Sequence, residues 1–279
     1  MNGKRQTVVE VVTLTLFLLL AALTQWQSDM TLGRVYHRQQ IKQIPPVYYP
    51  TATAIRQTDL GFHRASADLV WLALIQYFGG GNPNQPYLSL VDMLNTVVDL
   101  DPSFEYPYLF GGVILPWQDE PQAGLALLNQ GIKQYPNNGL LYYYAGSTAK
   151  IQLDQPALAA TYFQQAIGKE NTPPAAAILA GVSLTELDNR DFARTWWQGI
   201  LDDPKQTEVI KDRAKVWLGH LDLTIELERL IAKTNRASDV PIKSLDDLVT
   251  RGILKSIPRS PLEAPLIYNP TTGRVDLVK

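Results

Sequence analysis

The first strongly apolar stretch of the chain is an uncharged run over residues 11–23. Extended to Val8 and Trp26, the run is 19 residues long and contains one charge, Glu10. A helix needs about 20 mostly apolar residues to cross the hydrocarbon of a bilayer. The pattern therefore predicts a membrane-crossing helix at residues 8–26.

The flanks of this run indicate its orientation. Lys4 and Arg5 precede it, which favours a cytoplasmic N-terminus, and Trp26 lies where an interfacial aromatic residue is expected. Residues 1–28 are interpreted as an uncleaved signal anchor, with Glu10 and Trp26 as candidate contacts to a partner in the membrane. A cleaved signal peptide is the alternative, but no clean small-x-small site precedes a polar start.

A spacer is predicted over residues 29–58, which contain three prolines, among them the pair Pro45-Pro46. Proline lacks the amide donor of a helix and pushes the residue before it into an extended conformation. Tyr48 and Tyr49 are candidates for pinning this extended spacer onto the next domain. A solvated linker is the alternative interpretation.

The middle of the chain repeats its pattern of large and small residues every 34 or 35 positions. Each unit contains two apolar periodic segments, which is typical of a helix–turn–helix pair. Small residues at fixed positions let the two helices approach closely, and a bulky residue fills the gap to the next pair. The equivalent positions in three units are Tyr108, Gly112, Gly124, Leu128 and Gly131; Tyr143, Ser147, Ala159, Phe163 and Ala166; and Ala177, Gly181, Ala193, Trp197 and Ile200.

This pattern resembles the tetratricopeptide repeat (TPR) superfamily over residues 60–204, with a degenerate first unit. The resemblance implies an all-α fold, in which an N-terminal transmembrane helix is followed by a TPR-like α-solenoid over residues 59–235. The stretch from Tyr48 to Gly79 is similar to the opening of a group of bacterial membrane-anchored TPR proteins. That similarity implies a component of a bacterial envelope. Together with the uncleaved anchor and its basic N-terminal flank, it predicts a single-pass protein of the bacterial inner membrane, with a cytoplasmic N-terminus and a periplasmic or otherwise extracytoplasmic repeat domain.

The last part of the chain does not follow the 34- or 35-residue repeat. Residues 205–235 show apolar spacings of three and four, so they are interpreted as the closing helices of the array. Residues 236–279 predict a small C-terminal helix and β-hairpin module. Its helix begins after Ser244, which has Asp247 as a capping-box partner three residues on. Two strands then flank a turn at residues 269–273.

Composition narrows the classes of function. The chain has 25 basic and 27 acidic residues and a formal charge of −2, which lacks the electrostatic footprint of a nucleic-acid binder. It contains no Cys, which removes disulfides and thiolate metal sites. His37, His63 and His220 have no partner at metal-ligand spacing. We therefore expect no metal, no cofactor and no catalytic residue, since the 44-residue tail is also too small for a catalytic domain.

The TPR resemblance also implies a binding groove, because TPR arrays bind ligands on the concave face that the first helix of each pair lines. The residues at the groove positions are Leu69, Leu72 and Gln76; Tyr106, Leu109 and Val113; Leu141, Tyr144 and Thr148; and Ile178 and Val182. An apolar groove that bears tyrosines suits an amphipathic helix or an extended apolar peptide of a protein partner. The alternative is that residues 40–58 or the C-terminal module fill the groove.

Together these features predict a membrane-anchored TPR scaffold that mediates protein–protein interaction within a bacterial cell-envelope complex, and not an enzyme. The alternative is a passive accessory subunit of a larger membrane machine, such as a pilus, secretion, respiratory or photosynthetic assembly. In that alternative the transmembrane helix itself holds the chain in the machine.

Overall fold

The computed structural model describes residues 49–80, 87–187, 189–238 and 240–278. The predicted anchor, including Glu10 and Trp26, lies outside these residues, and so does most of the predicted spacer. Within the described ranges, no helix has the length and apolar character needed to cross a bilayer. The chain divides into Met1–Tyr48 and a compact unit Tyr49–Lys279, and the described residues all belong to the second unit.

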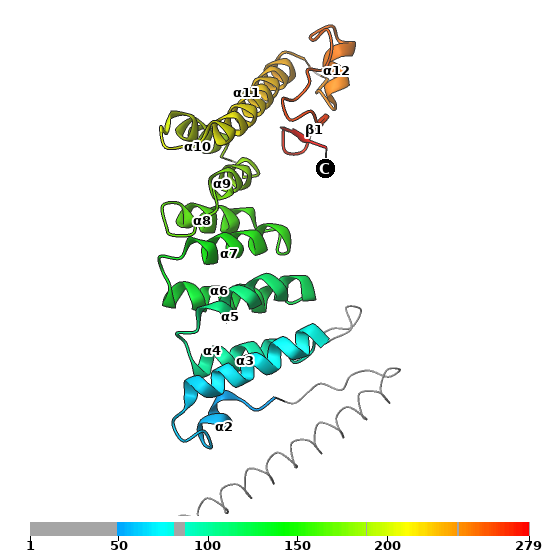
Figure 1. Ribbon diagram of the computed structural model, residues 1–279. Helices are drawn as coiled ribbons and strands as arrows, with labels where there is room; N and C mark the ends of the chain where they lie inside the picture. The colour runs from blue at the N-terminus through cyan, green and yellow to red at the C-terminus, as the bar shows by residue number, and fades with distance from the viewer. Residues whose placement is uncertain (1–48, 81–86, 188, 239, 279) are drawn as a thin grey trace, which may run out of the picture. The chain divides into compact units, whose positions relative to one another are not determined.

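The described part of the chain is mostly helical, as the sequence predicts, with one two-stranded sheet. Eight helices form four consecutive pairs, and each pair packs against the next one along the chain (Figure 1). The pairs are α3 (His63–Gly80) with α4 (Leu90–Leu100), α5 (Glu105–Ile114) with α6 (Pro121–Gln134), α7 (Gly139–Ile151) with α8 (Pro156–Ala166), and α9 (Ala175–Thr185) with α10 (Arg190–Asp202). A short 3₁₀ helix, η1 (Leu115–Gln118), extends α5.

Glycines in the first helices allow the second helices to approach closely. A Cβ built on Gly112 would lie 2.3 Å from Leu128, and one on Gly181 would lie 2.5 Å from the Trp197 ring. Carbon atoms in contact are normally about 3.5–4.0 Å apart, so neither position has room for a side chain. The predicted close approach of the two helices is therefore present at these two sites, but Leu128 and Trp197 meet the glycine of their own pair, whereas the sequence predicts that they fill the gap to the next pair.

The middle repeat follows the same rule one residue earlier than predicted. Gly146, and not Ser147, contacts Phe163, because a Cβ at Gly146 would lie 2.8 Å from that ring. Tyr142, and not Tyr143, is the buried tyrosine of this unit. Its hydroxyl donates to the Pro136 carbonyl at 3.2 Å, as the Tyr108 hydroxyl donates to the Pro102 carbonyl at 3.1 Å. The first helices α5 and α7 are thus related by 34 residues.

The predicted closing helices are a single helix, α11 (Glu208–Ala237), of 30 residues. Its first half packs on α10, where the rings of Trp197 and Trp217 stack in parallel with centroids 5.7 Å apart. Gly219 does not interrupt the helix. It lies where Pro261 approaches, since a Cβ built there would be 3.3 Å from that proline ring.

The C-terminal segment has the predicted elements. Ser244 and Asp247 form the capping box of α12 (Leu245–Thr250). β1 (Leu266–Asn269) and β2 (Arg274–Leu277) form an antiparallel hairpin, in which Leu266 pairs with Leu277 and Asn269 with Arg274. The core of this module includes Leu227 and Ile231 of α11, so the last turns of that helix form one hydrophobic cluster with α12 and the hairpin.

One arginine joins the repeat pairs to the hairpin. Arg190, at the start of α10, is 8% exposed. Its guanidinium donates to the Thr224 hydroxyl at 2.8 Å and to the Val275 carbonyl at 2.9 Å, and it pairs with Glu228 at 2.9 Å and Asp276 at 3.0 Å. Burial lowers the pKa of Arg190, and the two carboxylates oppose that shift. α10, α11 and β2 thus meet at a single side chain.

The described end of the predicted spacer is helical at residues 52–56, which corrects the prediction of an extended segment there. α2 (Ala52–Arg56) begins after Thr51, whose hydroxyl accepts from the Ala54 amide at 3.3 Å. The helix packs on α4. Tyr49 lies against the hydrophobic clusters at this end of the unit, as the sequence predicts, and its burial raises its pKa. A short helix can follow Pro50 because proline does not restrict the residues after it.

His220 is a buried histidine of α11 and is 3% exposed. Its Nδ1 lies 3.0 Å from the Ser260 hydroxyl, and its ring packs edge-on against Trp217. Burial lowers the pKa of His220 to about 4; the nearby charge of Arg190 adds to this shift and that of Asp276 opposes it. The imidazole is therefore neutral in the folded protein at pH 7.

We expect this burial to make the fold sensitive to acid. An unfolded histidine has a pKa of about 6.5 and takes up a proton as the pH falls, whereas the folded His220 does not do so until about pH 4. Above about pH 6.5 the protonation of His220 does not lower the free energy of unfolding. Between about pH 6.5 and pH 4 that free energy falls by up to about 3 kcal/mol. Urea denaturation between pH 7 and pH 4 should show that the free energy of unfolding depends less on pH in His220→Asn than in the wild-type chain. Parallel curves for the two chains would contradict the conclusion that buried His220 makes the fold sensitive to acid.

Candidate partner-binding surface

The first helix of each pair has one face that its own pair does not cover. On α5 and η1 this face consists of Tyr106, Leu109, Val113 and Trp117, which are spaced by three, four and four residues. Tyr106 is 57% exposed and Trp117 is 70% exposed, and the two residues between them are half-buried. Spacings of three and four place side chains along one side of a helix. The result is an apolar strip that begins and ends with an exposed aromatic ring.

The same strip recurs on α7, 34 residues further along the chain. It consists of Leu140, Tyr143, Ser147 and Ile151, of which Ile151 is 66% exposed and the others are half-buried. This shift by one residue changes the predicted groove. Leu141 is 0% exposed and Thr148 is 4% exposed, so these two belong to the core and do not line an accessible surface. Tyr144 is half-buried and packs against the same core as Leu109.

On α9 the strip continues with Ile178 and Val182, both half-buried. They follow Tyr143 and Ser147 by 35 residues, so the predicted residues of this helix keep their positions. The residue that follows Ile151 by the same 35 positions is Glu186, just after α9. The amine of Lys150 lies 2.7 Å from the Glu186 carboxylate. The apolar strip therefore gives way to an ion pair at this point.

The predicted residues of α3 are also exposed. Leu69 is 67% exposed, Leu72 is 57% exposed and Gln76 is exposed as well. α3 meets α5 through Trp71, whose ring lies edge-on to Tyr106 with centroids 5.6 Å apart. An apolar helix face without a covering element in the described part of the chain thus lies next to the strip on α5.

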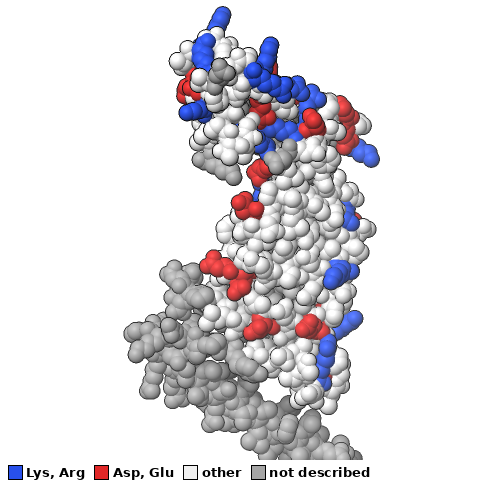
Figure 2. Space-filling view, turned by 180° about the vertical axis from the view of Figure 1, so that it is seen from behind, with Lys and Arg blue, Asp and Glu red and all other residues white. Residues whose placement is uncertain are grey.

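The repeat pairs carry few charges. Residues 121–187 contain six charged side chains in 67 positions, which are Lys133, Lys150, Asp154, Lys169, Glu170 and Glu186. In Figure 2 the middle of the described unit is mostly white, whereas charges gather at its C-terminal end. A surface with so few charges gives little electrostatic steering, and a partner on it must be recognised by shape and apolar contact.

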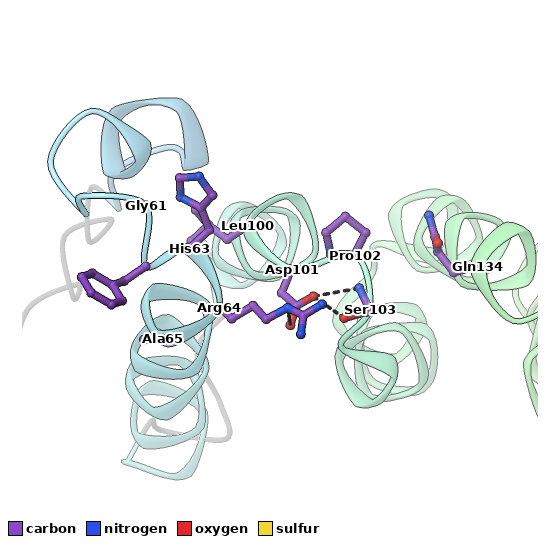
Figure 3. Close-up of a pocket in the computed structure, with 10 residues that line it drawn as sticks. Gly61, His63, Arg64, Ala65, Leu100, Asp101, Pro102, Ser103 and Gln134 are labelled. Carbon is purple, nitrogen blue, oxygen red and sulfur yellow. Dashed lines mark hydrogen bonds and ion pairs between the residues drawn. The ribbon is translucent and has the colours of Figure 1, made fainter.

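A separate depression of about 680 Å³ lies beside the N-terminus of α3 (Figure 3). The turn between α4 and α5 and the end of α6 line its other sides. In Figure 3 the Arg64 side chain points across it toward Asp101, and Arg64 Nε lies 3.9 Å from the carboxylate. Asp101 also accepts from the amide and the hydroxyl of Ser103, at 2.9 and 2.6 Å. The charged groups of this depression thus pair with one another.

His63 lines this depression, and its imidazole pairs with an aspartate just before α3. Its Nδ1 lies 2.6 Å from the Asp59 carboxylate, and the hydrogen bond from His63 lowers the pKa of Asp59. Asp59 also accepts from the Gly61 amide at 3.1 Å and interacts with Ser66. Ser66 and His63 therefore both contact the Asp59 carboxylate, which also closes an Asx turn through the Gly61 amide before α3 begins.

Sequence reasoning missed Trp117. Its 34-residue counterpart is Ile151, and both lie exposed at the ends of first helices. The signal was available in the spacing, but Pro116 directly before Trp117 indicates a helix end and hides the continuation through η1. Of the adjacent residues Trp196 and Trp197, the sequence predicts one ring in the core and leaves the other as a second candidate for docking. The indole of Trp196 instead donates to the Ala177 carbonyl at 3.0 Å and its ring is half-buried, so it is a packing residue.

No group of three or more metal-binding side chains occurs among the residues that the structure describes. The chain was also compared with known proteins. Neither a scan against protein-family models nor a search of curated proteins finds a match to it.

Proposed function

We propose that this chain is a membrane-anchored scaffold of the bacterial cell envelope, which holds a protein partner on a TPR-like array. The array comprises the pairs from α3 to α10, and the anchor is the apolar segment at residues 8–26. The repeated close approach of a glycine to a large residue, at Gly112, Gly146 and Gly181, supports the TPR-like assignment. So does the 34-residue spacing of equivalent hydrogen bonds.

The observation that carries the proposal is the recurrence of the uncovered strip. Tyr106, Leu109 and Trp117 have counterparts 34 residues later, and both strips end in a large apolar side chain that is at least 66% exposed. Side chains that stay in water contribute no burial energy to folding, and a contiguous exposed apolar strip commonly marks a protein–protein interaction site. Aromatic residues in shallow apolar surfaces commonly contribute most to the affinity for a partner.

The chemistry of the strip indicates the kind of segment that it binds. Half-buried Leu109, Val113, Ile178 and Val182 form shallow apolar contacts, and the surrounding surface has few charges. A helix that presents apolar side chains at spacings of three and four, with few charges beside them, matches this surface. The proposed partner segment is therefore an amphipathic helix of low charge from another envelope protein.

Replacing both exposed residues, Trp117→Ser and Ile151→Ser, should remove the partner without unfolding the array. Both side chains point into solvent, so their loss leaves the core unchanged. The full-length chain, solubilised from native membranes, should co-purify at least about tenfold less partner when it carries both changes. The matched control is Val209→Ser on α11, which removes an equally exposed apolar side chain, 74% exposed, outside the strip.

A further inference from the structure

The face of α3 that points away from α4 carries a regular row of exposed residues. The row consists of Phe62, Ala65, Leu69, Leu72, Gln76 and Gly79, which are separated by three, four, three, four and three positions. All six are exposed, and Phe62, Leu69 and Leu72 are 69%, 67% and 57% exposed. The opposite face, with Ala67, Val70 and Leu74, is buried against the rest of the unit.

Alternating spacings of three and four average 3.5 residues, which is the period at which one helix keeps contact with another at a shallow angle. The row, called here the α3 seam, begins at Phe62, directly before the 18-residue helix, and continues along it to Gly79. It contains no charged side chain, and Asp68 beside it is the nearest acid on the helix. Two copies of this seam can therefore approach without bringing like charges into the contact.

We propose that the occupant of the α3 seam is the α3 seam of a second copy of this chain, paired antiparallel about a two-fold axis. The axis passes between Val70 and Trp71, at the middle of the seam. In this arrangement Leu69 of one copy lies against Leu72 of the other, Ala65 lies against Gln76, and Phe62 lies against Gly79. Each large side chain thus meets a small one toward the ends, and the two leucines fill the centre.

Side-chain size selects this arrangement over the alternatives. A parallel pair would set Phe62 against Phe62 and Gly79 against Gly79, which overfills one end and leaves a gap at the other. In an isologous two-fold contact the same patch of both copies forms the interface, so the patch must fit a second copy of itself in the antiparallel orientation. The α3 seam has this property. A helix of an unrelated protein would not require the α3 sequence to have this property.

The size of the contact sets its expected strength. A pair of 18-residue helices is in contact over about 27 Å. This places the interface at the small end of specific interfaces, below about 1,200 Å² in total, so the pairing is weak and reversible. Two copies held in one membrane would have a high effective concentration, which favours such a contact. This inference concerns α3, and it does not rest on the proposed partner on α5, α7 and α9.

The pairing can be tested by cysteine crosslinking, because the chain contains no cysteine of its own. Full-length chains that carry Leu69→Cys or Leu72→Cys, in mild detergent or in vesicles, should form disulfide-linked dimers with copper phenanthroline and double in apparent mass. Chains with Ala65→Cys should stay monomeric, because a rise of 1.5 Å per residue puts the two copies of this position about 16 Å apart along the axis. A mixture of Ala65→Cys and Gln76→Cys chains should instead form a mixed dimer.

The exposed position Val209→Cys on α11 measures random collision. Equal crosslinking at this position and at position 72 would overturn the proposal. Self-crosslinking of Ala65→Cys as strong as that of Leu72→Cys would show a parallel contact and would also overturn it. If another part of the same chain or a different protein covers α3, no disulfide-linked homodimer forms at positions 69 and 72. That result would also overturn the proposal. Loss of partner binding by the Trp117 and Ile151 variant leaves the crosslinking pattern unchanged, so the two proposals fail separately.

Discussion

Replacing Arg190 with methionine should lower the free energy of unfolding by about 3 kcal/mol, the largest effect that we expect from one polar side chain of this unit. Methionine keeps much of the apolar stem but removes the guanidinium. The Val275 carbonyl then loses this donor, and the Glu228 carboxylate, which is 20% exposed, loses the cation that pairs with it in a largely buried site. Removing one side of a buried charge pair leaves the other charge uncompensated, which costs more than the pair contributed.

The loss should be concentrated in the C-terminal module. Arg190 binds the Val275 carbonyl, and Glu228 accepts from the Val275 amide at 2.8 Å, so the two side chains hold both backbone groups of one residue of β2. Amide hydrogen exchange of residues 266–277 should therefore accelerate in Arg190→Met more than exchange in α5 to α8. Both the free energy and the exchange pattern are measurable on the same preparation.

Arg194→Met on the same helix is the matched control. Arg194 pairs with Asp222 at 2.7 Å, but its side chain is 47% exposed and that of Asp222 is 49% exposed. Exposed ion pairs contribute little because water screens them, so we expect the free energy of unfolding to stay nearly unchanged. Equal effects of the two substitutions would contradict the role given to Arg190.

Gly181→Ala should destabilise the chain by about 2 kcal/mol, although alanine is the better helix former. The added Cβ would lie 2.5 Å from Cζ2 of Trp197 and within 2.7 Å of two further ring atoms. Trp197 is 0% exposed, stacks on Trp217 and donates to the Thr185 hydroxyl at 3.1 Å. The ring is held on all sides and cannot retreat, so α9 and α10 must separate.

The same substitution at Gly199 should have the opposite sign. Gly199 lies within α10, and a Cβ built there meets no atom within 4 Å. Gly199→Ala therefore gains helix propensity without a clash, which stabilises by up to about 1 kcal/mol. Denaturant unfolding of the two variants tests the packing rule directly. Destabilisation of the same size at both positions would show that helix propensity and not close approach controls the effect.

The helix pairs were predictable from the sequence because small and large residues recur in it at fixed intervals, and a small residue is needed wherever two helices approach closely. A glycine that must meet a large ring leaves a small residue at a fixed interval from a large one, and Gly181 with Trp197 shows this directly. Pro121 and Pro156 stand at the first positions of α6 and α8, where proline is tolerated and marks the start of a helix. Ser244 with Asp247 could be predicted as a cap because the hydrogen bonds involve neighbours in sequence.

The register of α7 was not predictable, and the reason is local. Three tyrosines in a row, Tyr142 to Tyr144, and two small residues, Gly146 and Ser147, fit the repeat pattern in either of two positions. The choice depends on long-range contacts, the Phe163 ring and the Pro136 carbonyl. Because of this one-residue shift, Leu141 and Thr148 lie in the core and not in the predicted groove, and Tyr143 lies at the surface.

The C-terminal contacts were hidden for a similar reason. Arg190 binds residues that are 34 to 86 positions away in the sequence. A short sequence motif cannot predict such a long-range contact. Gly219 lies within α11, although glycine is a poor helix former. The structure shows it as the place where Pro261 packs against one continuous helix. Sequence spacing does not distinguish a glycine that ends a helix from one that makes room for a neighbour.

The most direct test of the account is the amount of partner that the Trp117→Ser and Ile151→Ser chain recovers from native membranes, measured beside the Val209→Ser chain. The account predicts that the Val209→Ser chain retains a defined envelope protein at the wild-type amount and that the double variant loses it. Equal recovery by the two chains, at equal expression and equal thermal stability, would contradict the claim that the apolar strip on α5, η1 and α7 binds the partner.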